Sequence, residues 1–448
     1  MINASELISA RVPRYTSYPT APHFHPGIDA GIYSGWLQAL HPATPLSLYV
    51  HVPFCDTLCW FCGCHTTVVN TYSPLRSYLD LLEQEIGLIA GLLQPGHSVT
   101  HIHWGGGSPT MLQPGDIGRL ANALRERFSI VADAEFAIEI DPRGFNPELA
   151  AALRTAGVTR ASIGVQDCDA AVQRAINRIQ PMEETARAVD LLRDAEIRNL
   201  NVDLIYGLPH QTVAGIERTV DEVLALDPDR LAIFGYAHVP HFKKHQNLIP
   251  VAALPGAEER FAQAEAARAR LCGHGYVPIG IDHFAKPQDA MAKAQRQGRL
   301  TRNFQGYTTD DAPALIGLGA SSIGAFPKGY VQNIPDVPTY RSVLSAGRLP
   351  VARGIALSDD DRARRQVIER LMCDLRVDLD KVAASFGRTR DMFADSLRAL
   401  DSLVAEGMVS VDGGQVSVME SWRAGTRLVC AAFDTYLDNG VGRHAVAV

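Results

Sequence analysis

The sequence predicts an α/β fold in which helices cover a parallel sheet, followed by a smaller, mostly helical region. Two observations predict it. From residue 46, short β-branched runs alternate six times with longer amphipathic stretches, as in consecutive β/α units. After about residue 354 the alternation gives way to helical segments and one hairpin. We therefore divide the chain into an N-terminal arm, an α/β region, an extension of that region and a C-terminal region, with the bounds 1–45, 46–280, 281–353 and 354–448.

Each of the six units begins with an apolar strand pattern and continues with a helical one. The strand patterns lie at 46–52, 101–104, 135–140, 160–165, 201–207 and 230–236. The helical patterns lie near 74–93, 115–128, 146–156, 169–176 with 182–195, 212–226 and 256–273. This periodicity does not distinguish a partial barrel from an open, doubly wound sheet. In both arrangements we expect functional side chains at the carboxyl ends of the strands.

The pattern is looser from about 280 to 345 and then predicts a different kind of module. Helical segments at 359–373, 379–386 and 391–406 precede two strands at 408–418 around an Asp-Gly-Gly turn, and a last helix runs from about 421 to 437. Three helices and a hairpin are similar to a winged-helix module. Because its charge is mixed and no basic recognition helix stands out, we favour a lid or docking role over a DNA-binding regulator.

Composition narrows the class of protein. The chain is 46% hydrophobic and 20% charged, as soluble globular proteins are. Its net charge of −7, from 42 basic and 49 acidic residues, gives no reason to expect nucleic acid as a partner. The N-terminus lacks the apolar core of a signal peptide, and no apolar run reaches the roughly 18 residues that a membrane span needs. We therefore expect a cytoplasmic protein with reduced thiols.

Four of the eight cysteines, Cys55, Cys59, Cys62 and Cys64, lie close together after the first predicted strand. The first three have the spacing C-x3-C-x2-C. Iron–sulfur clusters prefer thiolate ligands, and three on one loop can hold three irons of a [4Fe–4S] cluster, which leaves the fourth iron open to another ligand. Structural zinc favours two pairs of ligands, and a ferredoxin site favours C-x2-C-x2-C with a fourth cysteine and a proline, so we favour both of them less.

Glycines and polar residues follow the other strands. The three glycines of HWGGGSPT (103–110) would let the backbone approach a ligand, although they would also suit a tight turn. Glu139 ends the third strand, where it could bind ligand hydroxyls or an amine, or cap a turn. Gln166 ends the fourth strand, Arg178 follows it, and Asp203 lies in the fifth. A buried ion pair is the structural alternative for Arg178 and Asp203, but strand-end positions favour ligand binding.

The C-x3-C-x2-C loop resembles the signature of the radical S-adenosylmethionine (SAM) enzymes. Seven further segments resemble one family among them, the oxygen-independent coproporphyrinogen III oxidases: YTSYPT, HWGGGSPT, GVQD, DLIYGLP, YAHVP, NFQGYTT and FDTYL. The resemblance extends over nearly the whole chain. It implies a (β/α)6 partial barrel that carries a [4Fe–4S] cluster and two SAM molecules.

The resemblance also implies roles for individual residues. Cys55, Cys59 and Cys62 would ligate the cluster, with Cys64 close to it but not bound. The first SAM would be held by Tyr49, Gly106, Glu139 and Ile323. The second would lie near Phe61, Gly107, Ser108, Gln166, Arg178, Asp203 and Ala237. Gln305 would lie near the substrate, and the segment 14–20 would close over the mouth of the barrel.

The implied reaction converts two propionates of coproporphyrinogen III to vinyl groups, giving protoporphyrinogen IX. No side-chain base can deprotonate the propionate β-carbon, so a cofactor radical is required. We expect a monomer that receives electrons from a low-potential reductant such as flavodoxin or ferredoxin. Cations that could meet the substrate carboxylates are Arg11, Arg14, Lys243, Lys244 and Arg302.

The alternative is a haem chaperone of the same superfamily. Such proteins usually lack YTSYPT and the fourth cysteine of the loop, and this chain has both. The C-terminus, GRHAVAV, departs from the oxidases because it lacks the Ser-Arg pair expected there.

Overall fold

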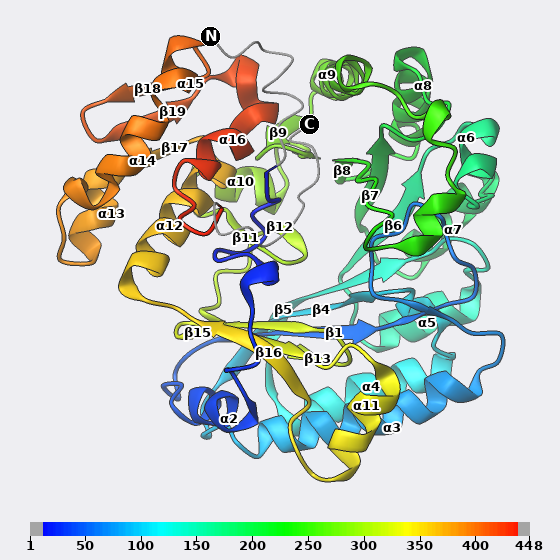
Figure 1. The fold of residues 1–448 in the computed structure, drawn as a ribbon. Coiled ribbons are helices and arrows are strands. Elements are labelled where there is room, and N and C mark those ends of the chain that lie inside the picture. Colours follow the sequence, from blue (N-terminus) through cyan, green and yellow to red (C-terminus); the bar gives the residue numbers. More distant parts are fainter. Residues whose placement is uncertain (1–11, 438–448) are drawn as a thin grey trace.

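The computed structural model describes residues 12–437, and its centre is one curved sheet of 12 strands (Figure 1). The segment from β13 to β8 is parallel, and both edges are extended by antiparallel strands. In spatial order the strands are β16 (Val351–Ala356), β15 (Gly329–Asn333), β14 (Ile323–Phe326), β13 (Ala314–Leu318), β1 (Leu46–Val52), β4 (Ser98–Gly106), β5 (Ser129–Ile140), β6 (Arg160–Gln166), β7 (Asn199–Tyr206), β8 (Arg230–Gly235), β10 (His283–Ala285) and β9 (Val277–Ile279).

Helices follow the parallel strands and pack on the outside of the sheet (Figure 1). They are α3 (Ser73–Ala90), α4 (Pro114–Arg127), α5 (Pro147–Thr155), α6 (Ala170–Ala175), α7 (Met182–Asp194), α8 (Val213–Leu224) and α9 (Ala257–Gly273). The six predicted β/α units are therefore confirmed. Strands covered on both faces need apolar side chains throughout, and β13 is buried at every position.

Local capping signals begin several of these helices directly after the strands. The Asn146 side chain accepts a hydrogen bond from the amide of Leu149 at the start of α5. The Thr212 hydroxyl does the same for Gly215 at the start of α8. Such caps satisfy amides that the first helical turn leaves free. They fix the lengths of the loops at the carboxyl edge of the sheet.

The stretch expected to be loose, from about 280 to 345, is largely ordered as strands and short helices. It contains β10 and β13–β15, a hairpin formed by β11 (Thr301–Asn303) and β12 (Gly306–Thr308), and the helices α10 (Ala290–Arg296) and α11 (Val337–Ser345). The sequence pattern missed them because strands of three to five residues carry too few alternations to be recognised. β13 lies beside β1, although more than 250 residues separate them in the chain.

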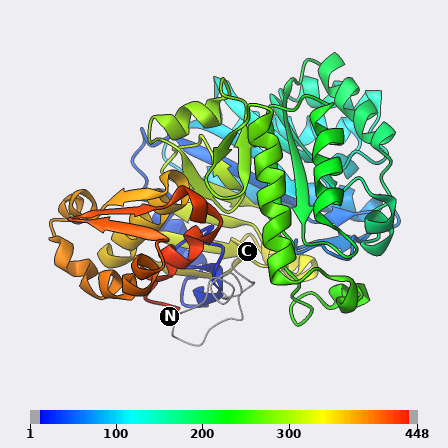
Figure 2. The same ribbon diagram turned by 90° about the horizontal axis from the view of Figure 1, so that it is seen from above.

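The C-terminal region has a hydrophobic core of its own and lies beside the barrel (Figure 2). Val12, Tyr15 and Tyr18 of the N-terminal arm are part of that core. Its elements are α12 (Asp359–Asp374), β17 (Arg376–Asp378), α13 (Leu379–Ser385), α14 (Ala394–Ala399), α15 (Asp401–Ala405), β18 (Val409–Asp412), β19 (Gln415–Val418) and α16 (Thr426–Ala431). The hairpin of β18 and β19 gains β17 as a third strand. The N-terminal arm also contains the helix α2 (Ala30–Gln38), whose Tyr33 and Trp36 side chains pack on Phe326 of β14.

Two helices expected in this region are shorter than the sequence pattern indicated. The segment 391–406 is broken, because the amide of Leu400 bonds the carbonyl of Leu397 in a tighter, three-residue turn between α14 and α15. The last helix is reduced to α16, because Trp422 has non-helical backbone angles (φ −115°, ψ 16°). Within residues 12–437 we find no helix long and apolar enough to cross a membrane.

Candidate active site

The cysteine loop leaves the carboxyl end of β1 and is fixed at several points along its length. Cys55 belongs to β2 (Phe54–Cys55), which pairs with β3 (Thr67–Val68) on the return of the loop. Side chains from other units hold the loop between these strands. Asn177 Nδ2 donates to Leu58 O at 2.9 Å, Gln246 Nε2 to Phe61 O at 3.0 Å, and Lys243 Nζ to Cys64 O at 2.8 Å. These three contacts hold the backbone of the loop and do not involve the thiols themselves.

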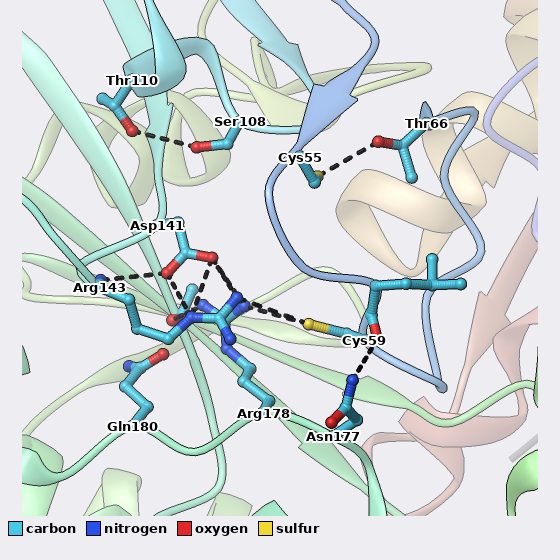
Figure 3. Close-up of polar contacts among 12 residues, drawn as sticks. Cys55, Cys59, Thr66, Ser108, Thr110, Asp141, Arg143, Asn177, Arg178 and Gln180 are labelled. Atoms are coloured by element: carbon cyan, nitrogen blue, oxygen red, sulfur yellow. Dashed lines mark hydrogen bonds and ion pairs between the residues drawn. The ribbon is translucent and has the colours of Figure 1, made fainter. Parts of the chain in front are cut away.

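Cys59 is the buried member of the loop, and two arginines point at its sulfur (Figure 3). Arg178 Nη1 lies 3.5 Å and Arg143 Nη2 3.7 Å from Cys59 Sγ. Asp141 lies between the two guanidinium groups, 3.1 Å from Arg178 Nη1 and 2.6 Å from Arg143 Nη2. Two cations with one carboxylate leave an excess of positive charge beside the sulfur.

The other thiols have different environments. Burial raises the pKa of Cys55 to about 11, although its sulfur accepts a hydrogen bond from Thr66 Oγ1 at 3.2 Å. Hydrogen bonding from Cys64 lowers the pKa of Cys62 to about 7. Part of this bonding is from the Cys64 amide, which lies 3.4 Å from the Cys62 sulfur. The loop therefore presents thiols with several N–H and O–H donors directed at them.

This donor set fits an iron–sulfur cluster better than a single ion. Across residues 12–437, no three His, Cys, Asp or Glu side chains are arranged to hold one metal ion. A four-iron cluster does not require such convergence, because each thiolate binds a different iron. The N–H groups directed at the sulfurs are also of the kind that stabilises the negative charge of a cluster.

The glycine run packs against the cysteine loop so closely that only glycine fits. A Cβ atom on Gly107 would lie 2.4 Å from Phe54 O, and the Ser108 amide bonds the same carbonyl at 2.8 Å. A Cβ on Gly105 would lie 2.6 Å from Glu139 Oε1. Gly106, at φ +120°, donates its amide to Glu139 Oε2 at 3.0 Å. The run thus joins the cysteine loop to the carboxylate at the end of β5.

A cavity of about 250 Å³ brings together all four residues expected to hold the first SAM: Tyr49, Gly106, Glu139 and Ile323. Cys64 and Gln305 line it as well. Burial alone would raise the pKa of Glu139, but hydrogen bonds from His103 Nε2, at 3.3 Å, and from the Gly106 amide hold it below its ordinary value. A charged carboxylate thus faces this cavity.

Six of the seven residues expected around a second SAM fall into three pairs. Gly107 and Ser108 contact Phe54 as described. Gln246 bonds the carbonyls of both Phe61 and Ala237, at 3.0 and 3.2 Å. Gln166 and Arg178 lie side by side over Gly164, where a Cβ would meet Gln166 Nε2 at 2.9 Å and Arg178 Nη2 at 3.3 Å.

Asp203 lies apart from these groups and does not pair with Arg178. Ser162 Oγ donates to Asp203 Oδ2 at 2.8 Å, and Asn201 Nδ2 to Asp203 Oδ1 at 2.8 Å. Arg178 pairs with Asp141 instead, so the ion pair weighed as an alternative for Arg178 and Asp203 is wrong. The sequence offers no reason to prefer Asp141, because the choice of partner depends on how the loop after β5 folds back. Asp203 lines another cavity of about 210 Å³, together with Glu139 and Gln305.

The cations expected near the substrate lie in different places in the structure. Arg14 and Arg302 line a third cavity, of about 360 Å³, which also includes Cys64, Ala237 and Gln305. Lys243 instead bonds the cysteine loop, and Lys244 is exposed. Arg11 and the tail GRHAVAV lie outside the described residues. Of the predicted closing segment 14–20, Arg14 and Thr16 line the third cavity, and Arg14 Nη2 donates to Gly235 O at 3.1 Å.

Among the arginines that sequence reasoning missed are Arg143, at the cysteine loop, and Arg260 and Arg427, which line the third cavity. Arg143 had a usable signal, because it follows Asp141 and a proline directly after a strand. Arg260 and Arg427 had none, since each lies in an ordinary helical pattern and outside the motifs.

The chain is similar to known proteins over nearly its whole length. The radical SAM superfamily model matches residues 49–223. The oxygen-independent coproporphyrinogen III oxidase of Bradyrhizobium diazoefficiens is 49% identical over 98% of this chain and 97% of its own length. The chain belongs to the oxygen-independent coproporphyrinogen III oxidase family. The oxidase of that name from Pseudomonas aeruginosa is 40% identical over 95% of this chain and 93% of its own.

A solved structure supports the same assignment for the fold. The coproporphyrinogen III oxidase of Escherichia coli, described as a radical SAM enzyme, matches with a TM-score of 0.91 and 41% identity, over 96% of this chain and 100% of that one. The expected family and fold class are thereby confirmed. Membership of the radical SAM superfamily implies a [4Fe–4S] cluster and SAM.

Proposed function

We propose that this protein oxidatively decarboxylates two propionate side chains of coproporphyrinogen III to vinyl groups, giving protoporphyrinogen IX. One observation carries the proposal: the cavity lined by Tyr49, Gly106, Glu139 and Ile323 adjoins the cysteine loop and shares Gln305 with the larger basic cavity. A radical generated in the first cavity could thus reach a substrate bound in the second. Similarity over the whole chain to named oxidases supports this function over a haem chaperone.

In this proposal, Cys55, Cys59 and Cys62 ligate a [4Fe–4S] cluster whose fourth iron is left to SAM. When bound and reduced, these groups supply a 5′-deoxyadenosyl radical, which takes the hydrogen atom that no side chain could remove as a proton. Arg143 and Arg178 stabilise negative charge at the Cys59 sulfur, and Asp141 orients both.

The chain's own groups position the cofactor. Glu139 is held by His103 and by the Gly106 amide, and its carboxylate accepts hydrogen bonds from the amine or the ribose hydroxyls of SAM. Because the glycine run carries no side chains, the cysteine loop and Glu139 pack directly against it and are held in position for the methionine part.

The proposal includes a second SAM near Phe61, Gly107, Ser108, Gln166, Arg178, Asp203 and Ala237. Support comes from the pairing of Phe61 with Ala237 through Gln246 and of Gln166 with Arg178 over Gly164. Equilibrium dialysis of SAM with the cluster-loaded enzyme would show two bound molecules per chain. A single bound molecule, unaffected by Gln166→Ala, would contradict this part.

We also propose where the enzyme works, its oligomeric state and its electron donor. The enzyme works in the cytoplasm as a monomer and receives electrons from a low-potential donor such as flavodoxin or ferredoxin. Sedimentation of the cluster-loaded protein tests the monomer, and reduction of the cluster by purified flavodoxin or ferredoxin tests the donor.

The deciding experiment is anaerobic. The cluster is reconstituted, a reductant, SAM and coproporphyrinogen III are added, and 5′-deoxyadenosine and tetrapyrroles are followed by mass spectrometry. We expect protoporphyrinogen IX from the parent enzyme and from Cys272→Ser, which alters a thiol on α9, but none from Cys62→Ser. SAM cleavage without decarboxylation, together with tight haem binding, would instead indicate a haem chaperone.

A further inference from the structure

The larger cavity contains arginines gathered from distant parts of the chain. Four of the arginines that line it come from four separate segments: Arg14 from the N-terminal arm, Arg260 from α9, Arg302 from β11 and Arg427 from α16. We refer to these four residues as the arginine cluster. Because it needs the arm, the barrel and the C-terminal region together, the cluster exists only in the completed fold.

The described residues of the cavity lining include more arginines than carboxylates. The described residues that line it include two acidic ones, and one of them, Glu265, pairs with Arg268 on the same helix at 2.7 Å. The other, Asp282, is shared between His283 Nδ1 at 2.7 Å and Arg302 Nη1 at 4.0 Å. The side chain of Arg302 is 6% exposed, yet its Nε has no hydrogen-bond partner among the described residues.

The arginines also disfavour one another's charge. Burial lowers the pKa of Arg427 to about 10, and the charges of Arg14 and Arg302 contribute to the decrease. Burial lowers the pKa of Arg260 as well, and Arg14 again contributes. All four remain protonated at neutral pH. Arginines that line one cavity can donate charge-assisted hydrogen bonds together to an anion bound there.

Aromatic side chains also line the larger cavity. Tyr206, Phe234, Tyr236 and Phe304 all line the cavity. The backbone leaves room for this arrangement, because a Cβ on Gly235 would lie 2.8 Å from the Tyr206 hydroxyl and 3.3 Å from Arg260 Nη2. A ligand that suits both parts of the wall has a ring-based apolar body and several carboxylates.

We propose that the arginine cluster binds the propionate carboxylates of the substrate that are not being decarboxylated, and so presents the reacting propionate to the cavity around Tyr49 and Glu139. This inference rests on the proposed function. A carboxylate that leaves as carbon dioxide gives up its charge. An arginine paired with it would stabilise the reactant more than the transition state and would slow the reaction. The cluster therefore holds the bystander carboxylates.

Equilibrium binding tests the cluster directly. The probe is coproporphyrin III, the stable oxidised tetracarboxylate, added to the anaerobic, cluster-loaded enzyme and followed by fluorescence. Arg260→Gln and Arg427→Gln are each expected to weaken binding by roughly ten- to a hundredfold, the loss of one charge-assisted hydrogen bond. The matched control is Arg270→Gln, also on α9 but paired with Asp221 outside the cavity, and it should bind as the parent does. The tetramethyl ester of coproporphyrin III should bind the parent enzyme weakly, and none of the three substitutions should change its affinity.

Kinetics then separate bystander carboxylates from the reacting one. With coproporphyrinogen III, both cluster variants should show a raised KM and an unchanged kcat, because the interactions are equally strong in the ground and transition states. Unchanged porphyrin binding in both variants, or a lowered kcat with an unchanged KM, would overturn the inference. Equal cluster iron content and melting temperature in all variants exclude misfolding. If the parent itself binds the porphyrin but does not decarboxylate the porphyrinogen, the proposed function fails instead.

Discussion

The cysteine loop and the arginine cluster are neighbouring regions that differ in how their partly buried arginines are arranged. At the cysteine loop, Asp141 pairs with Arg143 and Arg178, which also point at the Cys59 sulfur, so each cation has an acceptor within the protein. In the arginine cluster, the cations of the cavity lining outnumber its carboxylates. The first arrangement suits a group that stays bound, because it is complete before any ligand arrives. The second lines a cavity, which suits a substrate that enters and leaves.

The largest effect is expected from the thiol at the centre of the paired region. Cys59→Ser should remove cluster iron and reduce SAM cleavage by more than roughly a thousandfold, or about 4 kcal/mol of barrier. The reason is that a hydroxyl is a poor ligand for the iron. Iron and sulfide content and 5′-deoxyadenosine formation measure it, with Cys272→Ser as the control. A Cys59→Ser protein with a full cluster and normal cleavage would show that this thiol is not a ligand.

The next largest effect is on stability. Asp141→Asn should lower the free energy of unfolding by about 3–5 kcal/mol, because it leaves Arg178, whose side chain is 7% exposed, buried beside a second cation. The control is Asp80→Asn, since Asp80 is 57% exposed and pairs with Arg119 at the surface; it should cost at most about 1 kcal/mol. Urea unfolding of the cluster-free proteins compares the two. Equal midpoints would show that the charges at the cysteine loop are not stabilised by pairing.

The same comparison shows what the sequence could and could not predict. The loop, the glycine run and Glu139 were found because each follows a strand of the first three β/α units, where short motifs determine local structure. The structure brings together Tyr49, Gly106, Glu139 and Ile323, although their roles as SAM ligands stay predictions.

The arginine cluster could be predicted only in part. Arg14 and Arg302 were candidates because they lie near motifs, whereas Arg260 and Arg427 lie on helices whose patterns indicate only a packed and a solvated face. Their convergence depends on long-range packing: the arm joins the core of the C-terminal region, and that region lies beside the barrel. Pairing such as that of β13 with β1 is equally invisible to local periodicity.

A third buried ionisable group, Glu85, extends the comparison because it can avoid a buried charge by keeping its proton. Glu85 is fully buried and accepts hydrogen bonds from Tyr340 Oη, Asn333 Nδ2 and the Gly319 amide. Burial raises its pKa from 4.5 to about 7. Between these values the unfolded chain releases a proton that the native state keeps. Its contribution to stability is therefore fully present below pH 4.5 and is lost by roughly 3 kcal/mol as the pH rises to 7.

Glu85→Gln tests this sign, because glutamine does not ionise. The free energy of unfolding of the variant, measured relative to the parent from pH 4.5 to 7, should rise with pH by roughly the same 3 kcal/mol. Parallel pH curves for the two proteins would mean that Glu85 is charged in the native state.

The smallest expected effect distinguishes the two regions most directly. Burial and neighbouring arginines lower the pKa of Arg427, so the removal of its charge offsets the packing that the shorter side chain loses, and Arg427→Gln should change stability by no more than about 1 kcal/mol. In Asp141→Asn, by contrast, removing a charge leaves cations unpaired. Coproporphyrin III should raise the melting temperature of the parent much more than that of Arg427→Gln. A ligand-free Arg427→Gln protein as destabilised as Asp141→Asn would mean that the charge of Arg427, too, stabilises the ligand-free fold.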